Sequence, residues 1–438
     1  MTSRMLIRGG CVLTLGARSP NHAQADVLIE DDRVAEVGPR IRTRDAEVVD
    51  ATDSIVMPGF VDTHRHAWKS LFRNLGDGDP AGGFETLGPH HTAADVYSAT
   101  TIGLHGAIEA GITTVVDWSD VQVDASYTDA VLQAHADAGL RTVFVPAAPS
   151  WSDADLAPSL TRLAARRPHS PMTTFALGPT DPDRSDVEAS TADWDIARNH
   201  GWRIHAHCGR RLADAGVVAE LARQGLLGSD VTLVHCSRLD DADLDAIASS
   251  GAGVAITPTT EMTGGLGSPP MQRLIDREIR PGLGVDEERI GPGDLFAQMR
   301  AAISIQHGRH FELKLAGKGG LPNLLTTREV IRYATVDGAR VAGLHTATGS
   351  LEVGKQADVI VLRTDRPNVH PVNDPIGAVV WGMDTSNVAW VVAAGRVLMR
   401  DGALVADVAA IRERAIESQR RVAAAAGLVS AGSGEGGR

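Results

Sequence analysis

The chain has few cysteines, no cluster of basic residues and no long apolar segment. Only three of its 438 residues are cysteines, Cys11, Cys208 and Cys236. Three thiols are too few for a disulfide framework or for a zinc site built from thiolates. Acidic residues outnumber basic ones by 55 to 42, and the formal net charge is -13. This diffuse acidic charge argues against nucleic acid and anionic membranes as partners.

No apolar run reaches the roughly 18 residues that a membrane-spanning helix needs. Residues 1–10 also lack the apolar core of a signal peptide. We therefore expect a cytoplasmic protein without a membrane partner. Hydrophobic residues still make up 43% of the chain and charged residues 22%, which is typical of a globular protein with ample material for a core.

The pattern of short apolar segments changes twice along the chain. Both ends have the texture of short β-strands, for example at residues 25–30 and 357–362. In the middle, apolar runs alternate with helical segments, which is typical of a parallel sheet. Eight such units favour a closed barrel. The predicted fold class is α/β, a TIM-like (β/α)8 barrel with a small β-sandwich domain built from both termini. The eight runs end near Asp62, Asp117, Pro146, Gly178, His207, His235, Pro258 and Asp286.

Domain boundaries follow from the same changes in pattern. We expect a small β-domain from residues 1–54 and 351–405, a barrel from residues 55–350, and a C-terminal helix at residues 406–428. Residues 429–438 are rich in Gly and Ser and predict a flexible tail. Asp294 is the expected N-cap of a helix over residues 295–304. Thr326 and Glu329 predict a capping box that opens a helix running to about residue 342.

Two histidines one residue apart end the first predicted barrel strand. Alternate side chains of an extended strand share a face, so His64 and His66 point the same way. Such a pair is weak evidence alone, but His207, His235 and Asp286 stand at three other predicted strand ends. In a barrel these ends face one shared cup. Imidazoles with a carboxylate suit one divalent ion, zinc first, with Fe2+ or Mn2+ also compatible.

The order of several motifs resembles that of the amidohydrolase superfamily, in particular its cytosine deaminase and triazine hydrolase branch. The resemblance covers nearly the whole chain, including the flanking β-domain. The matching segments are residues 58–66, 111–117, 235–236, 284–286, 334–339 and 349–358.

The resemblance implies a metal held by His64, His66, His207 and Asp286. It also implies that His235 stands beside the metal, in contact with substrate or water. Asp286 would take a proton from the attacking water and hand it to the departing nitrogen, so Asp286 and His235 are the expected catalytic residues. No lysine stands where binuclear relatives place a carboxylated bridge, so one metal ion is expected rather than two.

One position departs from the family pattern. Deaminases of this branch carry a glutamate three residues after the strand 5 histidine, where it protonates a ring nitrogen of the substrate. Here that position is Arg210, which cannot act as an acid near neutral pH. Arg210 could instead bind a substrate carboxylate or phosphate, or it could be a solvated loop residue.

Four further residues are candidates for contact with substrate. Trp118 and Glu261 follow strands 2 and 7, where Trp118 could pack on a substrate and Glu261 could bind a cationic or amide group. Lys69 follows strand 1, and His205 shares a strand face with His207. Core packing, loop structure or simple solvation is the alternative for each of them.

The resulting hypothesis is a metal-dependent hydrolase that cleaves a carbon–nitrogen bond in an amide, cyclic amide or amidine. The substrate would be a small molecule or a short peptide-derived molecule, and the resemblance also allows a homodimer. One alternative is a deaminase of a nucleobase-like heterocycle, and another is an amide- or amidine-cleaving tailoring hydrolase of peptide natural-product biosynthesis. From a different class, the chain could be an inactive, metal-free binding protein, but its intact ligand set argues against this.

Overall fold

The structure is a computed structural model that describes residues 3–17, 19–75, 80–151, 157–165, 170–179, 187–211 and 215–428. The tail predicted at residues 429–438 lies outside the described residues. No helix in the described ranges is both long enough and apolar enough to span a bilayer.

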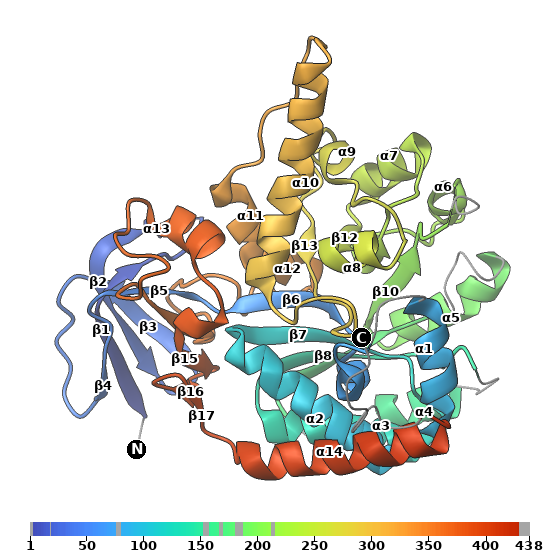
Figure 1. The fold of residues 1–438 in the computed structure, drawn as a ribbon, viewed down its shortest axis with the longest axis horizontal. Coiled ribbons are helices and arrows are strands. Elements are labelled where there is room, and N and C mark those ends of the chain that lie inside the picture. The colour runs from blue at the N-terminus through green and yellow to red at the C-terminus, as the bar shows by residue number, and fades with distance from the viewer. Residues whose placement is uncertain are drawn as a thin grey trace, which may run out of the picture.

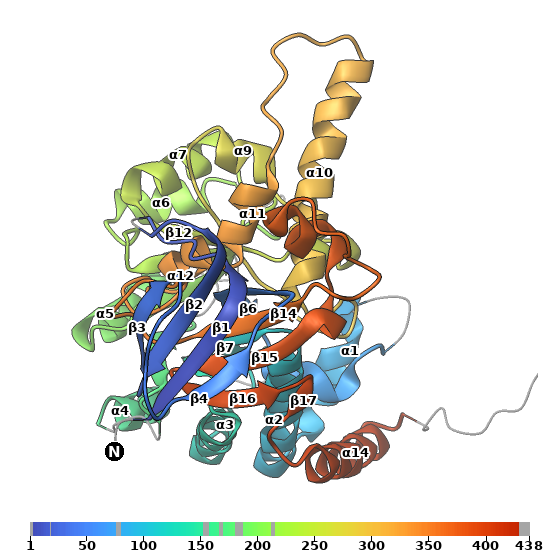
Figure 2. The same ribbon diagram turned by 90° about the vertical axis from the view of Figure 1, so that its left-hand side faces the viewer.

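Both ends of the chain contribute to one mixed sheet of nine strands, in which N-terminal and C-terminal strands lie side by side (Figure 2). The strand order is β17-β16-β15-β14-β5-β1-β2-β3, and β4 pairs with β1. The two ends of the chain meet where β5 pairs antiparallel with β14. The strands are β1 (Arg4–Val12), β2 (His22–Glu30), β3 (Arg33–Gly38), β4 (Glu47–Asp50), β5 (Ser54–Pro58), β14 (Val359–Arg363), β15 (Val388–Ala393), β16 (Arg396–Arg400) and β17 (Ala403–Leu404).

The middle of the chain forms an eight-stranded parallel sheet in strict sequence order, as the eight apolar runs predicted. Every residue of β6, β7 and β8 is buried, because strands of a parallel barrel are covered on both faces. The strands are β6 (Phe60–Arg65), β7 (Ile112–Ser119), β8 (Arg141–Pro146), β9 (Thr173–Leu177), β10 (Arg203–Cys208), β11 (Val231–His235), β12 (Gly253–Ile256) and β13 (Gly282–Leu283).

The barrel closes between its first and last strands. Arg65 and Asp286 form a parallel bridge, and the Asp286 backbone N–H donates to the His64 carbonyl over 2.8 Å. A glycine is required at this closure, because a Cβ at Gly284 would lie 2.8 Å from the backbone N and O of His64. The two strands that carry most of the predicted metal ligands are therefore direct neighbours.

One boundary differs from the sequence-based expectation. The apolar run that begins at Ile55 is divided at Gly59, so that β5 belongs to the terminal sheet and β6 begins the barrel. The Gly59 N–H donates to the carbonyl of Asp358 in one sheet, while the next N–H, of Phe60, donates to Gly111 on the barrel side. A continuous apolar run cannot reveal such a change of partner.

Helices cover the outside of the barrel, and α14 lies along α2 at its lower edge (Figure 1). The helices are α1 (Pro80–Leu87), α2 (Ala93–Glu109), α3 (Ala125–Ala138), α4 (Ala157–Ala164), α5 (Val187–Asn199), α6 (Val217–Arg223), α7 (Asp241–Ser250), α8 (Pro258–Thr263), α9 (Met271–Ile275), α10 (Leu295–Leu315), α11 (Thr327–Tyr333), α12 (Val336–Val341), α13 (Pro375–Gly377) and α14 (Val408–Ala425). Shorter 3-10 or π turns are η1 (Ala67–Phe72), η2 (Gly88–His90), η4 (Ala378–Gly382) and η5 (Thr385–Asn387).

Both predicted helix starts are confirmed. The Asp294 carboxylate accepts from the Ala297 N–H over 2.8 Å and caps α10, and Thr326 with Glu329 forms the capping box of α11. Helix α10 continues beyond the predicted end at residue 304 to Leu315 and projects from the body of the molecule (Figure 1). The helix predicted to reach residue 342 is instead two helices, α11 and α12. It breaks between them because the Ala334 carbonyl accepts from Val61 in β6.

Candidate metal centre and active site

The predicted ligands and His235 stand in or just after four barrel strands. His64 belongs to β6 and His66 follows it, His207 belongs to β10, and His235 ends β11. Asp286 follows β13, where its backbone pairs with His64. His235 and Asp286 have φ angles of 77° and 68°, left-handed values that are unfavourable for residues other than glycine. Such backbone conformations persist where the surrounding structure enforces them, and they cluster at functional sites.

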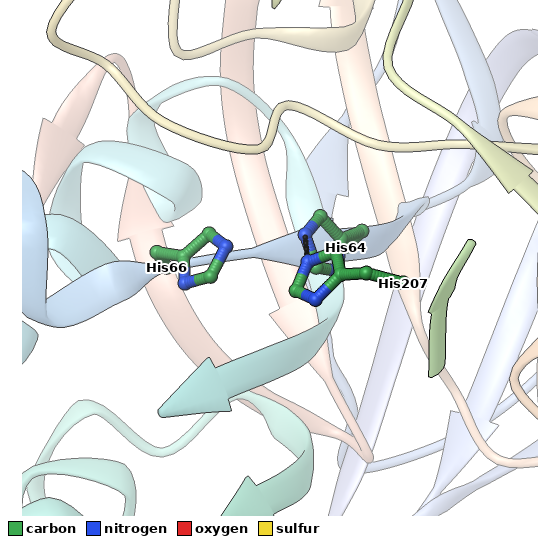
Figure 3. Close-up of side chains that lie close together, drawn as sticks. All are labelled: His64, His66 and His207. Carbon is green, nitrogen blue, oxygen red and sulfur yellow. Dashed lines mark hydrogen bonds between the residues drawn. The ribbon is translucent and has the colours of Figure 1, made fainter. Parts of the chain in front are cut away.

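Figure 3 shows the imidazoles of His64, His66 and His207 facing one another. The His64 Nε2 and His207 Nε2 atoms are 3.2 Å apart, and the His64 and His66 ring centroids are 4.9 Å apart. Asp286 completes the cluster, since its Oδ1 lies 3.5 Å from His64 Nε2 and 3.4 Å from His66 Nε2. The structure thus gathers on one spot the residues that the sequence places up to 222 positions apart.

The chemistry of these donors fits a divalent cation. Ligand atoms of His64, His66 and His207 all lie within 4.8 Å of one another, and so do those of His64, His235 and Asp286. Burial lowers the pKa of His64 to about 4 and lowers the pKa of His207 well below its usual value, so both rings are neutral near pH 7. The His64 and His207 Nε2 atoms, 3.2 Å apart, either share a proton between the two rings or both turn a lone pair to a cation, as the histidine ligands of a metal do.

Asp286 turns its two carboxylate oxygens to different neighbours. Oδ1 faces the histidines of β6, whereas Oδ2 lies 3.9 Å from His235 Nε2. Burial disfavours its charged form, but the hydrogen bond and charge of His64, together with the charges of His235 and His66, outweigh burial and hold the pKa of Asp286 well below its usual value. Asp286 is therefore an anion that can accept a proton on Oδ2 while Oδ1 stays with the ligand cluster.

The far side of the His66 ring contacts a second carboxylate. His66 Nδ1 and Asp120 Oδ1 are 2.8 Å apart. The same oxygen accepts from Trp68 Nε1 over 2.6 Å, and Lys69 Nζ lies 3.8 Å from Asp120 Oδ2. Burial disfavours the charged carboxylate, but the charges of His66 and Lys69 outweigh burial and lower the pKa of Asp120.

His235 has a comparable partner. Its Nδ1 lies 3.3 Å from Glu261 Oε1 and 3.2 Å from the Thr257 hydroxyl. The Glu261 side chain is fully buried, and its Oε1 also accepts from the Thr257 backbone N–H over 2.8 Å. Burial raises the pKa of Glu261, although the hydrogen bond to His235 opposes this.

Arg65, between the two histidines, points away from the ligand cluster into a buried ion network. Its Nε donates to Asp62 over 2.7 Å, and its Nη1 lies 3.2 Å from Glu288 Oε1. Glu288 also accepts from Arg73 and from the Ser70 hydroxyl, each over 2.7 Å. This network ties β6 to the segment after β13 behind the ligands.

The remaining candidates occupy different positions around the cluster. The Trp118 ring packs on His207 with centroids 4.2 Å apart, and Lys69 lies between Asp120 and Glu287. His205 is fully buried, and neither of its ring nitrogens has a hydrogen-bond partner within the described part of the chain. Arg210 is partly buried, and its charge helps to lower the pKa of His207 after the larger effect of burial.

Asp120, Arg65 and Glu288 are not among the site residues expected from the sequence. Asp120 could have been predicted as a site residue, since it follows Trp118 at the end of a predicted barrel strand. The position of Arg65 could also have been predicted, because a residue between two cup-facing positions of a strand must point to the opposite, buried face, where an arginine needs acidic partners.

With this geometry established, comparison with known proteins defines the class. Residues 55–398 match the Amidohydrolase family, and the chain belongs to that family. The 5-methylthioadenosine/S-adenosylhomocysteine deaminase of Thermococcus onnurineus (strain NA1) is 28% identical over 401 residues, which cover 86% of this chain and 90% of that protein.

Solved structures share the whole fold. An adenosine deaminase from Xanthomonas campestris with bound zinc superposes with a TM-score of 0.85 at 21% identity, over 96% of this chain and 99% of that one. The atrazine chlorohydrolase TrzN from Arthrobacter aurescens TC1, complexed with zinc, gives a TM-score of 0.81 at 23% identity, over 95% and 100% of the two chains. The predicted class is confirmed: the protein is a metal-dependent hydrolase of carbon–nitrogen bonds other than ordinary peptide bonds.

Proposed function

We propose that this protein binds one divalent ion, zinc, and hydrolyses an amide, cyclic amide or amidine group of a small molecule. The proposed ligands are His64, His66, His207 and Asp286. The observation that supports the proposal best is that the two carboxylate oxygens of Asp286 have different neighbours. Oδ1 faces the histidine ligands, while Oδ2 faces His235. When bound, the ion supplies Lewis acidity, which makes water a usable nucleophile near neutral pH.

In this mechanism Asp286 Oδ2 accepts a proton from the attacking water, whose oxygen forms a bond to the substrate carbon. The carbon–nitrogen bond then breaks, and Asp286 Oδ2 returns the proton to the departing nitrogen. His235 Nε2 lies on the same side as Oδ2, where it contacts the substrate. Trp118 packs against His207 and excludes water from that side of the cluster. The products are a carbonyl compound and ammonia or an amine.

Deamination of an aminated heterocycle is the second candidate. It is favoured by relatives such as the 5-methylthioadenosine/S-adenosylhomocysteine deaminase, which matches 86% of this chain. Arg210 stands against ordinary base deamination, because it cannot donate the proton that a glutamate would supply. Instead, we propose that Arg210 binds an anionic group of the substrate.

The test measures product release by the zinc-loaded enzyme on matched panels of amidines, cyclic amides and amino-heterocycles, each with and without a carboxylate or phosphate. We expect turnover of an amide or amidine, and we expect Asp286→Asn to lower kcat by about 10²–10⁴-fold because the proton carrier is lost. Arg210→Gln should raise KM only for the anionic substrates. An Asp286→Asn enzyme with the wild-type rate would contradict the mechanism, and turnover confined to amino-heterocycles would favour the deaminase.

A further inference from the structure

Asp120 lies outside the expected ligand set, yet it contacts a ligand directly. Its Oδ1 is 2.8 Å from His66 Nδ1, and on the opposite edge of the same ring His66 Nε2 faces Asp286. The two nitrogens of His66 therefore have two different carboxylate neighbours, one inside the ligand cluster and one behind it.

We propose that Asp120 is a positioning residue of the metal centre that holds His66 in the tautomer with a proton on Nδ1 and a free lone pair on Nε2. This inference rests on the proposed metal-dependent function. A neutral imidazole has one donor nitrogen and one acceptor nitrogen. An ionised carboxylate can only accept, and Asp120 at 2.8 Å is a closer partner of the ring than Asp286 at 3.4 Å. In a neutral His66 ring Nδ1 therefore donates to Asp120, and Nε2 keeps the lone pair that binds the metal. Such outer carboxylates fix the orientation of a ligating ring and raise its basicity.

Asp120 is itself held in place by two neighbours. Trp68 Nε1 donates to Oδ1 over 2.6 Å, and Lys69 lies near Oδ2. The Trp68 ring is fully buried and packs edge-on against Phe84 and His91, with centroids 5.4 Å and 5.3 Å away. A rigid aromatic cluster therefore fixes the carboxylate, and the carboxylate in turn fixes His66.

The ring of His64 differs in this respect. His64 Nδ1 is buried without a hydrogen-bond partner in the described residues, so no comparable carboxylate orients it from behind. We infer that Asp120 acts on His66 specifically, and that the loss of this carboxylate weakens metal binding through one ligand while the other histidines stay in place.

The test measures zinc affinity by competition with a chromogenic chelator and measures the His66 tautomer by nitrogen-15 NMR of the metal-free protein. Asp120→Ala should weaken zinc binding by about 10–100-fold. Asp120→Asn should weaken it less, because the amide oxygen still accepts from Nδ1. Trp68→Phe keeps the aromatic ring and should give an intermediate loss.

Asp95 provides the matched control. It is 3% exposed, accepts from the Thr92 backbone N–H at the start of α2 and pairs with Arg421. Asp95→Asn should lower stability and leave zinc affinity unchanged.

Unchanged zinc affinity in Asp120→Ala, or a wild-type His66 whose proton is on Nε2, would overturn the inference. The wild-type tautomer decides the question even if the alanine variant does not fold. A wild-type protein that binds no zinc at all would instead refute the proposed function.

Discussion

Two buried or partly buried carboxylates stand behind two histidines of the centre. Asp120 contacts His66 and Glu261 contacts His235, in both cases at Nδ1. In both rings Nε2 is directed toward Asp286. The two pairs differ in burial, because the Glu261 side chain is fully buried whereas 26% of the Asp120 side chain is exposed. The burial of Glu261 leads us to expect that it acts through His235 rather than by contact with the substrate.

This distinction leads to a prediction for Glu261→Gln. The glutamine keeps an acceptor for His235 Nδ1 but removes the carboxylate charge beside the ring. We expect kcat to fall about 10-fold or more with little change in KM. The sequence predicted that Glu261 contacts the substrate. In that case the substitution would instead raise KM. Steady-state kinetics separate the two roles, with Glu329→Gln in the distant α11 capping box as the control.

The ligand residues could be predicted because each stands at a strand end, where a pattern in the sequence fixes both its face and its height in the barrel. Asp120 directly follows β7, and Glu261 lies in the short helix α8 after β12. The sequence therefore indicates which side chains gather in the cup, but periodicity does not show which ring nitrogen each of these two carboxylates contacts.

At the level of elements, α10 links the centre to the outer surface. Its N-cap, Asp294, follows Gly293, whose carbonyl accepts from Arg65 Nη2 over 2.8 Å. At the far end, His307 and His310 donate to the carbonyls of Leu325 and Pro322. The sequence predicted the start of this helix but not its length, because these contacts with the returning segment extend it.

Removal of the α10 cap should destabilise the protein by about 1 kcal/mol, since Asp294→Ala leaves the Ala297 N–H without its acceptor. Asp294→Asn keeps an acceptor and should cost less. Urea unfolding monitored by circular dichroism measures both changes. Equal stability of the alanine variant and the wild type would show that the cap contributes nothing.

For the whole molecule, the buried histidines link stability to pH. Burial lowers the pKa of His64 to about 4, and it lowers the pKa values of His205 and His207 well below the usual value. In the unfolded chain these groups titrate near pH 6.5. As the pH falls below that value, the unfolded chain takes up protons that the folded chain does not, so unfolding becomes more favourable.

The metal-free protein should therefore lose stability as the pH falls from about 6.5 towards 4, and each pKa unit of difference is worth about 1.4 kcal/mol. Thermal unfolding at several pH values measures this loss. His205→Gln should make the dependence shallower, and zinc should make it steeper because protons compete with the metal for the same nitrogens. A melting temperature that is constant between pH 7 and pH 4.5 would contradict the prediction.

The closure of the barrel has a consequence for how the protein is made. Two of the proposed ligands, His64 and His66, come from the end of the first barrel strand, and a third, Asp286, comes from the segment after the last strand, where it pairs directly with His64. A growing chain on the ribosome cannot complete the centre until residue 286 has emerged. The terminal sheet can form only later, after β14 has been synthesised, because β5 pairs with β14. The proposed ion can therefore join the first barrel strand to the segment after the last one only when both have been synthesised.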